Sequence, residues 1–276
     1  MNYKIVTDSG ANLTDLPGVA FENVPITIMA DKKEYRDDRF LDVTQMITDL
    51  SQLTTKSSTA CPNIDQWMRA YAGADIVIVF TLTGALSGSY SAAVQARELY
   101  LEDHPEAKIF VLDSTSAGPR MELLIHKAVT LINEGVSFDG IKQALTLYLT
   151  KTKLIFSLES LTNLVNNGRV SRATAKVANL LKLRIVGTDT EGKLTPLGKA
   201  RGQAKALSLI LNEMEASGFI EGKVCIAHCL NEAGAKLLAE KIKAQHPKAQ
   251  ITLTKTRGIC SYYAEQGGLM VGFECL

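Results

Sequence analysis

Four segments rich in hydroxyl groups and glycine stand where the loops of an α/β protein can form a binding site. Three of them follow apolar runs of the sequence: Thr7-Asp8-Ser9-Gly10, residues 81–89 and residues 113–118. The fourth, residues 57–62, precedes a helical pattern. Hydroxyl groups and free amides at helix N-termini can bind an anion without a full positive charge. This chemistry suits a phosphate or a carboxylate.

The same residue types also cap helices and turn chains for purely local reasons. A binding site is nevertheless favoured, because the carboxyl ends of parallel strands meet at one edge of a sheet, where α/β proteins bind ligands. Asp8 and Asp113 fit a supporting role there, in which their carboxylates accept hydrogen bonds from neighbouring loop amides.

Several catalytic motifs are absent from the sequence. No Gly-x-Gly-x-x-Gly follows the first apolar run, and no Gly-Lys pair is followed by Ser or Thr, which argues against dinucleotide and P-loop sites. Ser87 is not part of a Gly-x-Ser-x-Gly nucleophile elbow. No His, Asp or Glu cluster has metal-ligand spacing. We therefore expect binding rather than catalysis, with no catalytic residue, cofactor or metal.

The four histidines do not suggest a catalytic group either. His126 lies in an apolar helical pattern and His228 in an apolar strand pattern, so both are predicted to be core residues. His104 and His246 each precede a proline between a helix and a strand, which predicts exposed loop positions.

The first half of the chain alternates apolar strand patterns with helical periodicity, as βαβ units do. Nearly continuous apolar runs predict strands covered on both faces at residues 3–7, 75–80 and 108–112. Asn63 and Gln66 form a capping-box pattern at the start of a helix. Further helices are predicted at residues 41–53, 89–101, 120–133 and 138–149.

The pattern changes after about residue 151. Residues 184–195 predict a hairpin with Gly192 in its turn. Helices are predicted at residues 158–165, 171–183, 202–216 and 232–244, and strands at residues 224–229, 251–256 and 269–274. The fold class is therefore α/β: a Rossmann-like parallel-sheet domain over residues 1–152, and a mixed α+β domain over residues 153–276.

The composition describes a globular protein. Hydrophobic residues make up 46% of the 276 residues, and 30 Lys+Arg against 29 Asp+Glu give a net charge of +1, which argues against a nucleic-acid partner. The sequence begins without a signal-peptide pattern, and its densest apolar run, residues 76–80, is too short to span a membrane. We expect a cytoplasmic protein whose five cysteines are reduced and mostly buried.

Several short motifs stand in order along nearly the whole chain. Residues 59–63 read Thr-Ala-Cys-Pro-Asn, residues 86–90 read Leu-Ser-Gly-Ser-Tyr, and the other motifs are residues 6–9, 111–114, 167–171 and 198–201. Together they resemble the DegV family of fatty-acid-binding proteins, the binding subunits of bacterial fatty acid kinase. That family usually has Thr-Ser-Gln-Pro-Ser and Leu-Ser-Gly-Thr-Tyr where this chain has the first two motifs.

The resemblance implies a long-chain fatty acid held in an interior tunnel, while a partner kinase phosphorylates its carboxylate with ATP. It places the carboxylate-binding threonine and serine at Thr59 and Ser87. Gly88 and Ser9 are also predicted to contact the carboxylate. It also implies that Arg169 and Arg201 dock the partner or a membrane surface, with transient contact to the latter.

One departure from the family pattern lies near the C-terminus. Many relatives have His-Thr-Gly-Pro-Gly there, and their histidine joins the carboxylate network. Tyr263, or Tyr262 with a one-residue shift, takes the place of this histidine and is predicted to contact the carboxylate. A phenol can donate a hydrogen bond but carries no positive charge near neutral pH. An alternative function is a small-molecule phosphotransferase or hydrolase that uses the loops at Asp8 and Asp113.

Overall fold

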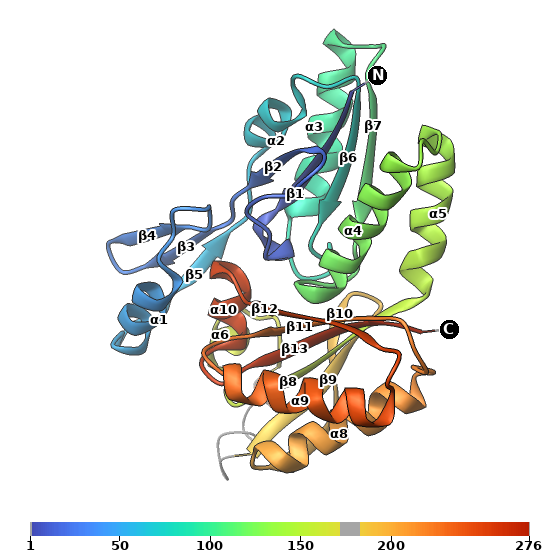
Figure 1. Cartoon of the computed structure of the whole chain (residues 1–276). Helices are drawn as coiled ribbons and strands as arrows, with labels where there is room; N and C mark the ends of the chain where they lie inside the picture. Colours follow the sequence, from blue (N-terminus) through green and yellow to red (C-terminus); the bar gives the residue numbers. More distant parts are fainter. Residues whose placement is uncertain (1, 172–182, 276) are drawn as a thin grey trace.

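The computed structural model describes residues 2–171 and 183–275 and has an α/β architecture with two main sheets (Figure 1). The first sheet is parallel, with strand order β2-β1-β6-β7. Its strands are β1 (Tyr3–Asp8), β2 (Ala20–Val24), β6 (Ile76–Thr81) and β7 (Lys108–Asp113). A short 3-10 helix, η1 (Ser9–Ala11), follows β1.

Helices cover both faces of this parallel sheet (Figure 1). On one face, α2 (Ile64–Tyr71) and α3 (Ser89–Asp103) bury Trp67 and Tyr71 against Val77. On the other face, α4 (Pro119–Asn133) and α5 (Phe138–Thr150) pack against Ile78. All six residues of β6 are buried, which explains the continuous apolar pattern that predicted it.

The second sheet is mixed, with strand order β10-β9-β8-β13-β11-β12. The helices α8 and α9 cover one face, and α4 packs against β13 on the other. The elements of this half are β8 (Thr152–Leu158), α6 (Thr162–Asn166), β9 (Leu183–Thr190), β10 (Lys193–Arg201), α8 (Gln203–Ala216), β11 (Lys223–His228), α9 (Glu232–Gln245), β12 (Gln250–Lys255), α10 (Gly258–Ala264) and β13 (Leu269–Glu274).

A small antiparallel sheet lies beside the other two and was not predicted (Figure 1). It consists of β3 (Thr27–Ala30), β4 (Lys33–Arg36) and β5 (Ser58–Ala60), with α1 (Val43–Ser51) next to it. The buried carboxylate of Asp37 accepts hydrogen bonds from the amides of Gly258 and Ile259, at 2.8 and 2.7 Å. This contact ties the small sheet to the start of α10.

Besides the small sheet, the strand β2 was not predicted, and the predicted elements differ from the structure at three further places. The helix predicted at residues 158–165 begins only at Thr162, because Leu158 still belongs to β8, a strand that was not predicted. The helix α10 was not predicted either. The helix predicted at residues 171–183 lies almost wholly outside the described residues.

The histidine and cysteine predictions can also be compared with the structure. His228 is buried and His104 exposed as expected, and His246 is half-buried, but the prediction of a core position for His126 is wrong. The apolar side chains around His126 in the sequence face the core, while its own side chain points to solvent. All five cysteines are free thiols, and three of them are buried.

Glu122 on α4 is a buried carboxyl group that makes the stability of the fold depend on pH. Its side chain is 3% exposed, Oε2 accepts a hydrogen bond from the Cys225 thiol at 3.2 Å, and Oε1 has no hydrogen-bond partner. Burial raises the pKa of Glu122 to about 7. A carboxyl group whose pKa is higher in the folded than in the unfolded protein stabilises the folded state at a pH below its pKa in the unfolded protein. This stabilisation is lost as the pH rises through its pKa in the folded protein.

We expect Glu122→Gln to remove this dependence, since the amide stays neutral at every pH. The free energy of unfolding of the variant, relative to that of the unmodified protein, should rise by about 3 kcal/mol between about pH 4 and about pH 8. Urea denaturation at the two pH values measures it. The same difference in the free energy of unfolding between the two proteins at both pH values would contradict the raised pKa of Glu122.

Candidate functional site

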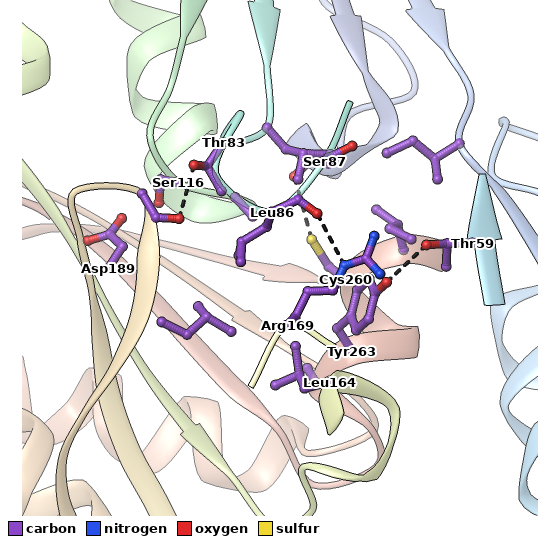
Figure 2. A pocket seen from close by; sticks show the side chains of 18 of the residues that line it. Thr59, Thr83, Leu86, Ser87, Ser116, Leu164, Arg169, Asp189, Cys260 and Tyr263 are labelled. Carbon is purple, nitrogen blue, oxygen red and sulfur yellow. Dashed lines mark hydrogen bonds between the residues drawn. The ribbon is translucent and has the colours of Figure 1, made fainter. Parts of the chain in front are cut away.

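A cavity of about 330 Å³ lies between the loops of the parallel sheet and the inner face of the mixed sheet (Figure 2). Its volume is in the range of small-molecule sites. Most of its wall is apolar, from the loop after β6, from β8 and β13, and from α10. The apolar side chains are Ile26, Ala60, Leu82, Leu86, Ala117, Leu154, Phe156, Leu158, Leu164, Leu194, Ile259, Ala264 and Met270.

The parallel sheet brings three of the hydroxyl-rich loops to one edge, as predicted. Asp8 is fully buried at the end of β1, and its carboxylate accepts hydrogen bonds from Gly10 N, Leu82 N and Ser89 Oγ, at 3.0, 2.9 and 2.6 Å. Burial raises its pKa to about 6, although these three donors favour the ionised form. Asp8 therefore orients the loops and does not line the cavity.

Asp113 has the same supporting role one strand further along the sheet. Its carboxylate accepts hydrogen bonds from Thr115 N at 2.8 Å and from Gly84 N at 3.1 Å. The prediction that both aspartates hold loop amides is confirmed.

One side of the cavity carries a cluster of polar groups around Thr59 and Tyr263 (Figure 2). Thr59 lies on β5, and its hydroxyl is 2.9 Å from the Tyr263 hydroxyl on α10. The guanidinium of Arg169 lies 5.9 Å from the centre of the Tyr263 ring, and its Nε donates to Leu86 O at 3.1 Å. We call Thr59, Ser87, Arg169 and Tyr263 the polar mouth.

Ser87 and Gly88 reach the polar mouth from the loop before α3. The Ser87 hydroxyl accepts a hydrogen bond from Ser89 N at 3.2 Å, and Gly88 is the N-cap residue of α3. A side chain at Gly88 would approach the Cys61 thiol to 3.1 Å, so the small residue keeps this loop close to the end of β5. The free amides at the start of α3 are of the kind that bind anions in other proteins.

The structure brings together five of the eight residues predicted for binding or docking: Thr59, Ser87, Gly88, Arg169 and Tyr263. The other three are Ser9, Tyr262 and Arg201, and none of them lines the cavity.

Each of those three has a different environment. The Ser9 hydroxyl accepts a hydrogen bond from Ile26 N at 3.1 Å, behind the cavity wall. Tyr262 is 1% exposed, and its hydroxyl bonds to Ser57 Oγ at 2.7 Å and to Asn167 Nδ2 at 2.9 Å. Arg201 is exposed at the end of β10. Of the two tyrosines, Tyr263 is thus the one that reaches the cavity.

Three further polar residues line the cavity and were not assigned a role from the sequence. Thr83 and Ser116 lie within hydroxyl-rich segments that the sequence did single out. Asp189 lies in the hairpin strand β9, where no sequence pattern distinguishes it. Its carboxylate is paired with Arg120 at 2.8 Å.

The described part of the chain contains no group of three or more His, Cys, Asp or Glu side chains that could hold a metal ion. Over the same residues, no helix is long and apolar enough to cross a bilayer.

The architecture and the cavity define the class of protein: an α/β protein that encloses an apolar cavity with a hydroxyl-rich mouth between a parallel and a mixed sheet. Residues 2–274 match the family model described as an uncharacterised protein of the DegV family. The chain belongs to the DegV family, as the sequence motifs predicted.

Relatives and solved structures agree with this assignment. A DegV domain-containing protein of Streptococcus pyogenes serotype M3 is 43% identical, over 99% of this chain and 100% of its own length. The fatty acid kinase (Fak) B3 protein of Streptococcus pneumoniae, loaded with linoleic acid, is similar with a TM-score of 0.98, 40% identity and full coverage of both chains. A DegV family protein of Eubacterium eligens, loaded with heptadecanoic acid, has a TM-score of 0.97 and 39% identity, over 99% of this chain and all of its own.

The turn between β9 and β10 closes one side of the cavity. Glu191 and Gly192 have φ values of 50° and 77°, and Gly192 O accepts a hydrogen bond from Thr83 Oγ1 at 3.0 Å. A Cβ atom on Gly192 would overlap the Thr83 side chain.

We expect Gly192→Ala to lower the free energy of unfolding by about 2 to 3 kcal/mol, through backbone strain and this overlap. Gly73→Ala is the matched control, because Gly73 also has a positive φ, 88°, but nothing within 4 Å of the added carbon. The control should lose only about 1 kcal/mol. Thermal or urea denaturation of both variants measures the difference, and equal losses would disprove a specific contact with Thr83.

Proposed function

We propose that the protein binds a long-chain fatty acid in the cavity and presents its carboxylate at the polar mouth to a fatty acid kinase. The observation that carries this proposal is an apolar cavity whose wall includes the hydroxyl groups of Thr59, Ser87 and Tyr263. The related structures from S. pneumoniae and E. eligens, which hold linoleic and heptadecanoic acid, support it.

The chemistry of the polar mouth suits a carboxylate that must remain reactive. Thr59, Ser87 and Tyr263 offer neutral hydroxyl donors. A bidentate arginine would occupy both carboxylate oxygens, whereas single hydroxyl donors leave one oxygen free to attack a phosphoryl group. Arg169 is already engaged with Leu86 O and the carbonyl of Asn167, so its charge stabilises the bound anion from the side.

The apolar wall supplies the binding energy. At about 0.8 kcal/mol per buried methylene, a chain of about 16 carbons gains roughly 10 kcal/mol before the cost of association. A ligand held this tightly leaves slowly.

We also propose that the boundary between the two domains lies at residue 152. With this boundary, the cavity lies at the junction of the two domains.

We also propose that the protein is not itself an enzyme. A phosphotransferase or hydrolase built on Asp8 and Asp113 is the alternative. It has less support, because both carboxylates are occupied by loop amides and neither residue lines the cavity.

Thr59→Ala and Ser87→Ala should each weaken fatty acid binding by about 1 to 3 kcal/mol, because each removes one hydrogen-bond donor from the carboxylate. Native mass spectrometry of the purified protein, followed by titration with oleic acid, measures this. Ser58→Ala is the matched control, since Ser58 lies beside Thr59 on β5 but is exposed. Unchanged affinity in both mouth variants would rule out this carboxylate site.

Arg201 provides a separate test of the kinase partnership, because the resemblance to the DegV family implies a docking role for it. It is exposed and lies outside the cavity wall. Arg201→Glu should therefore slow acyl phosphate formation by an added kinase subunit and ATP by about tenfold, while oleic acid affinity stays unchanged. Lys193→Glu, at the other end of β10, is the charge-matched control. Equal rates in the Arg201 variant and the control would refute the docking role.

A further inference from the structure

Behind the polar mouth, three hydrogen-bonded side chains form a network that does not itself line the cavity: Ser57, Asn167 and Tyr262. The Tyr262 hydroxyl lies 2.7 Å from Ser57 Oγ and accepts a hydrogen bond from Asn167 Nδ2 at 2.9 Å. Because this hydroxyl accepts from Asn167, its own proton can be donated to Ser57. Tyr262 is 1% exposed, so the loss of either partner would leave a buried polar group unpaired. We call these three residues the supporting network.

Each residue of the supporting network precedes a residue of the polar mouth by one or two positions in the sequence. The first pair belongs to the β5 segment, the second to α10, and the third to the end of α6 and the residues after it. The network therefore joins three segments that are far apart in the sequence and that each bring one side chain to the mouth. The pairs are Ser57 with Thr59, Tyr262 with Tyr263, and Asn167 with Arg169.

Asn167 acts on Arg169 through the backbone. Asn167 ends α6, and the next residue, Gly168, has a φ of 72°, which glycine adopts readily. Arg169 N then donates to Leu164 O at 2.8 Å, and Arg169 Nη1 donates to Asn167 O. Arg169 Nε donates to Leu86 O, in the loop before α3. The position of the guanidinium therefore depends on where Asn167 is held.

Tyr262 acts on Tyr263 through ring packing and through β5. The two rings meet edge to face, with their centres 4.8 Å apart and their planes at 75°. Tyr263 contacts the Thr59 hydroxyl at 2.9 Å, just as Tyr262 contacts that of Ser57 (Figure 2 shows the first of these two contacts). Only the contact between Thr59 and Tyr263 faces the cavity. The buried contact behind it fixes the spacing between β5 and α10.

We propose that the hydrogen bond between Asn167 and Tyr262 keeps the polar mouth in the arrangement that a carboxylate needs. Both are positioning residues, because they act on the ligand only through the side chains of the mouth. The inference rests on the proposed function and adds to it the residues that support the site from behind. Donors that are fixed before the ligand arrives bind an anion more tightly than donors that must first be ordered.

The experiment compares the affinity for oleic acid with the affinity for oleyl alcohol, which has the same chain but no charge. Dissociation constants come from displacement of cis-parinaric acid, a fluorescent fatty acid, from delipidated protein. Tyr262→Phe removes one hydroxyl group and keeps the ring, and Asn167→Ala removes the amide. Each variant should lower the ratio of acid affinity to alcohol affinity about fivefold. A loss of folding stability alone would weaken both ligands equally and leave the ratio unchanged.

Tyr71→Phe is the matched control. Tyr71 is fully buried, its hydroxyl donates to Ala93 O at 2.7 Å between α2 and α3, and it does not line the cavity. Its affinity ratio should equal that of the unmodified protein. An unchanged ratio in Tyr262→Phe or in Asn167→Ala, or an equal fall in the control, would overturn the inference and leave the proposed function intact. Failure of the unmodified protein to bind oleic acid would overturn the proposed function itself.

Discussion

The buried carboxylate of Asp8 is the interaction on which the site depends. Its hydrogen bonds to Gly10 N, Leu82 N and Ser89 Oγ join the loop after β1 to the loop after β6 and to the first residue of α3. The two loops supply much of one cavity wall, including Leu82 and Ser87. Burying a charge is unfavourable, and three good donors offset that cost only while both loops keep this arrangement.

The opposite wall of the cavity is held by a second buried charged group with several hydrogen bonds. Arg120 on α4 donates to Thr152, Leu149 and Asp189, and so connects the parallel-sheet half of the chain to β8 and β9. Asp189 is held at the cavity surface by this pair and by Leu154 N. The apolar middle of the cavity thus lies between two fixed polar frameworks, one within the parallel-sheet half of the chain and one that joins the two halves.

The sequence predicted those parts of the protein that depend on local pattern. The six buried residues of β6, the capping box at Asn63 and the hairpin turn at Gly192 all follow from spacing and residue type. The small sheet was missed because its strands have only three or four residues, many of them polar. β8 was missed because it follows α5 with only Lys151 between them and no glycine or proline to mark the change.

The site was predictable in part, through the motifs around Thr59, Ser87 and Tyr263. The cavity wall was not predictable. Leu154 and Phe156 would show the same sequence pattern whether they faced a ligand or packed within a hydrophobic core. Because the cavity wall consists of core residues, any molecule that fills the cavity takes the place of a part of the hydrophobic core and can leave again. Loading and folding stability are then linked by mass action: at a ligand concentration of 100 times Kd, occupancy adds about 2.7 kcal/mol to the free energy of unfolding. The melting temperature of this protein would therefore rise with the occupancy of the cavity.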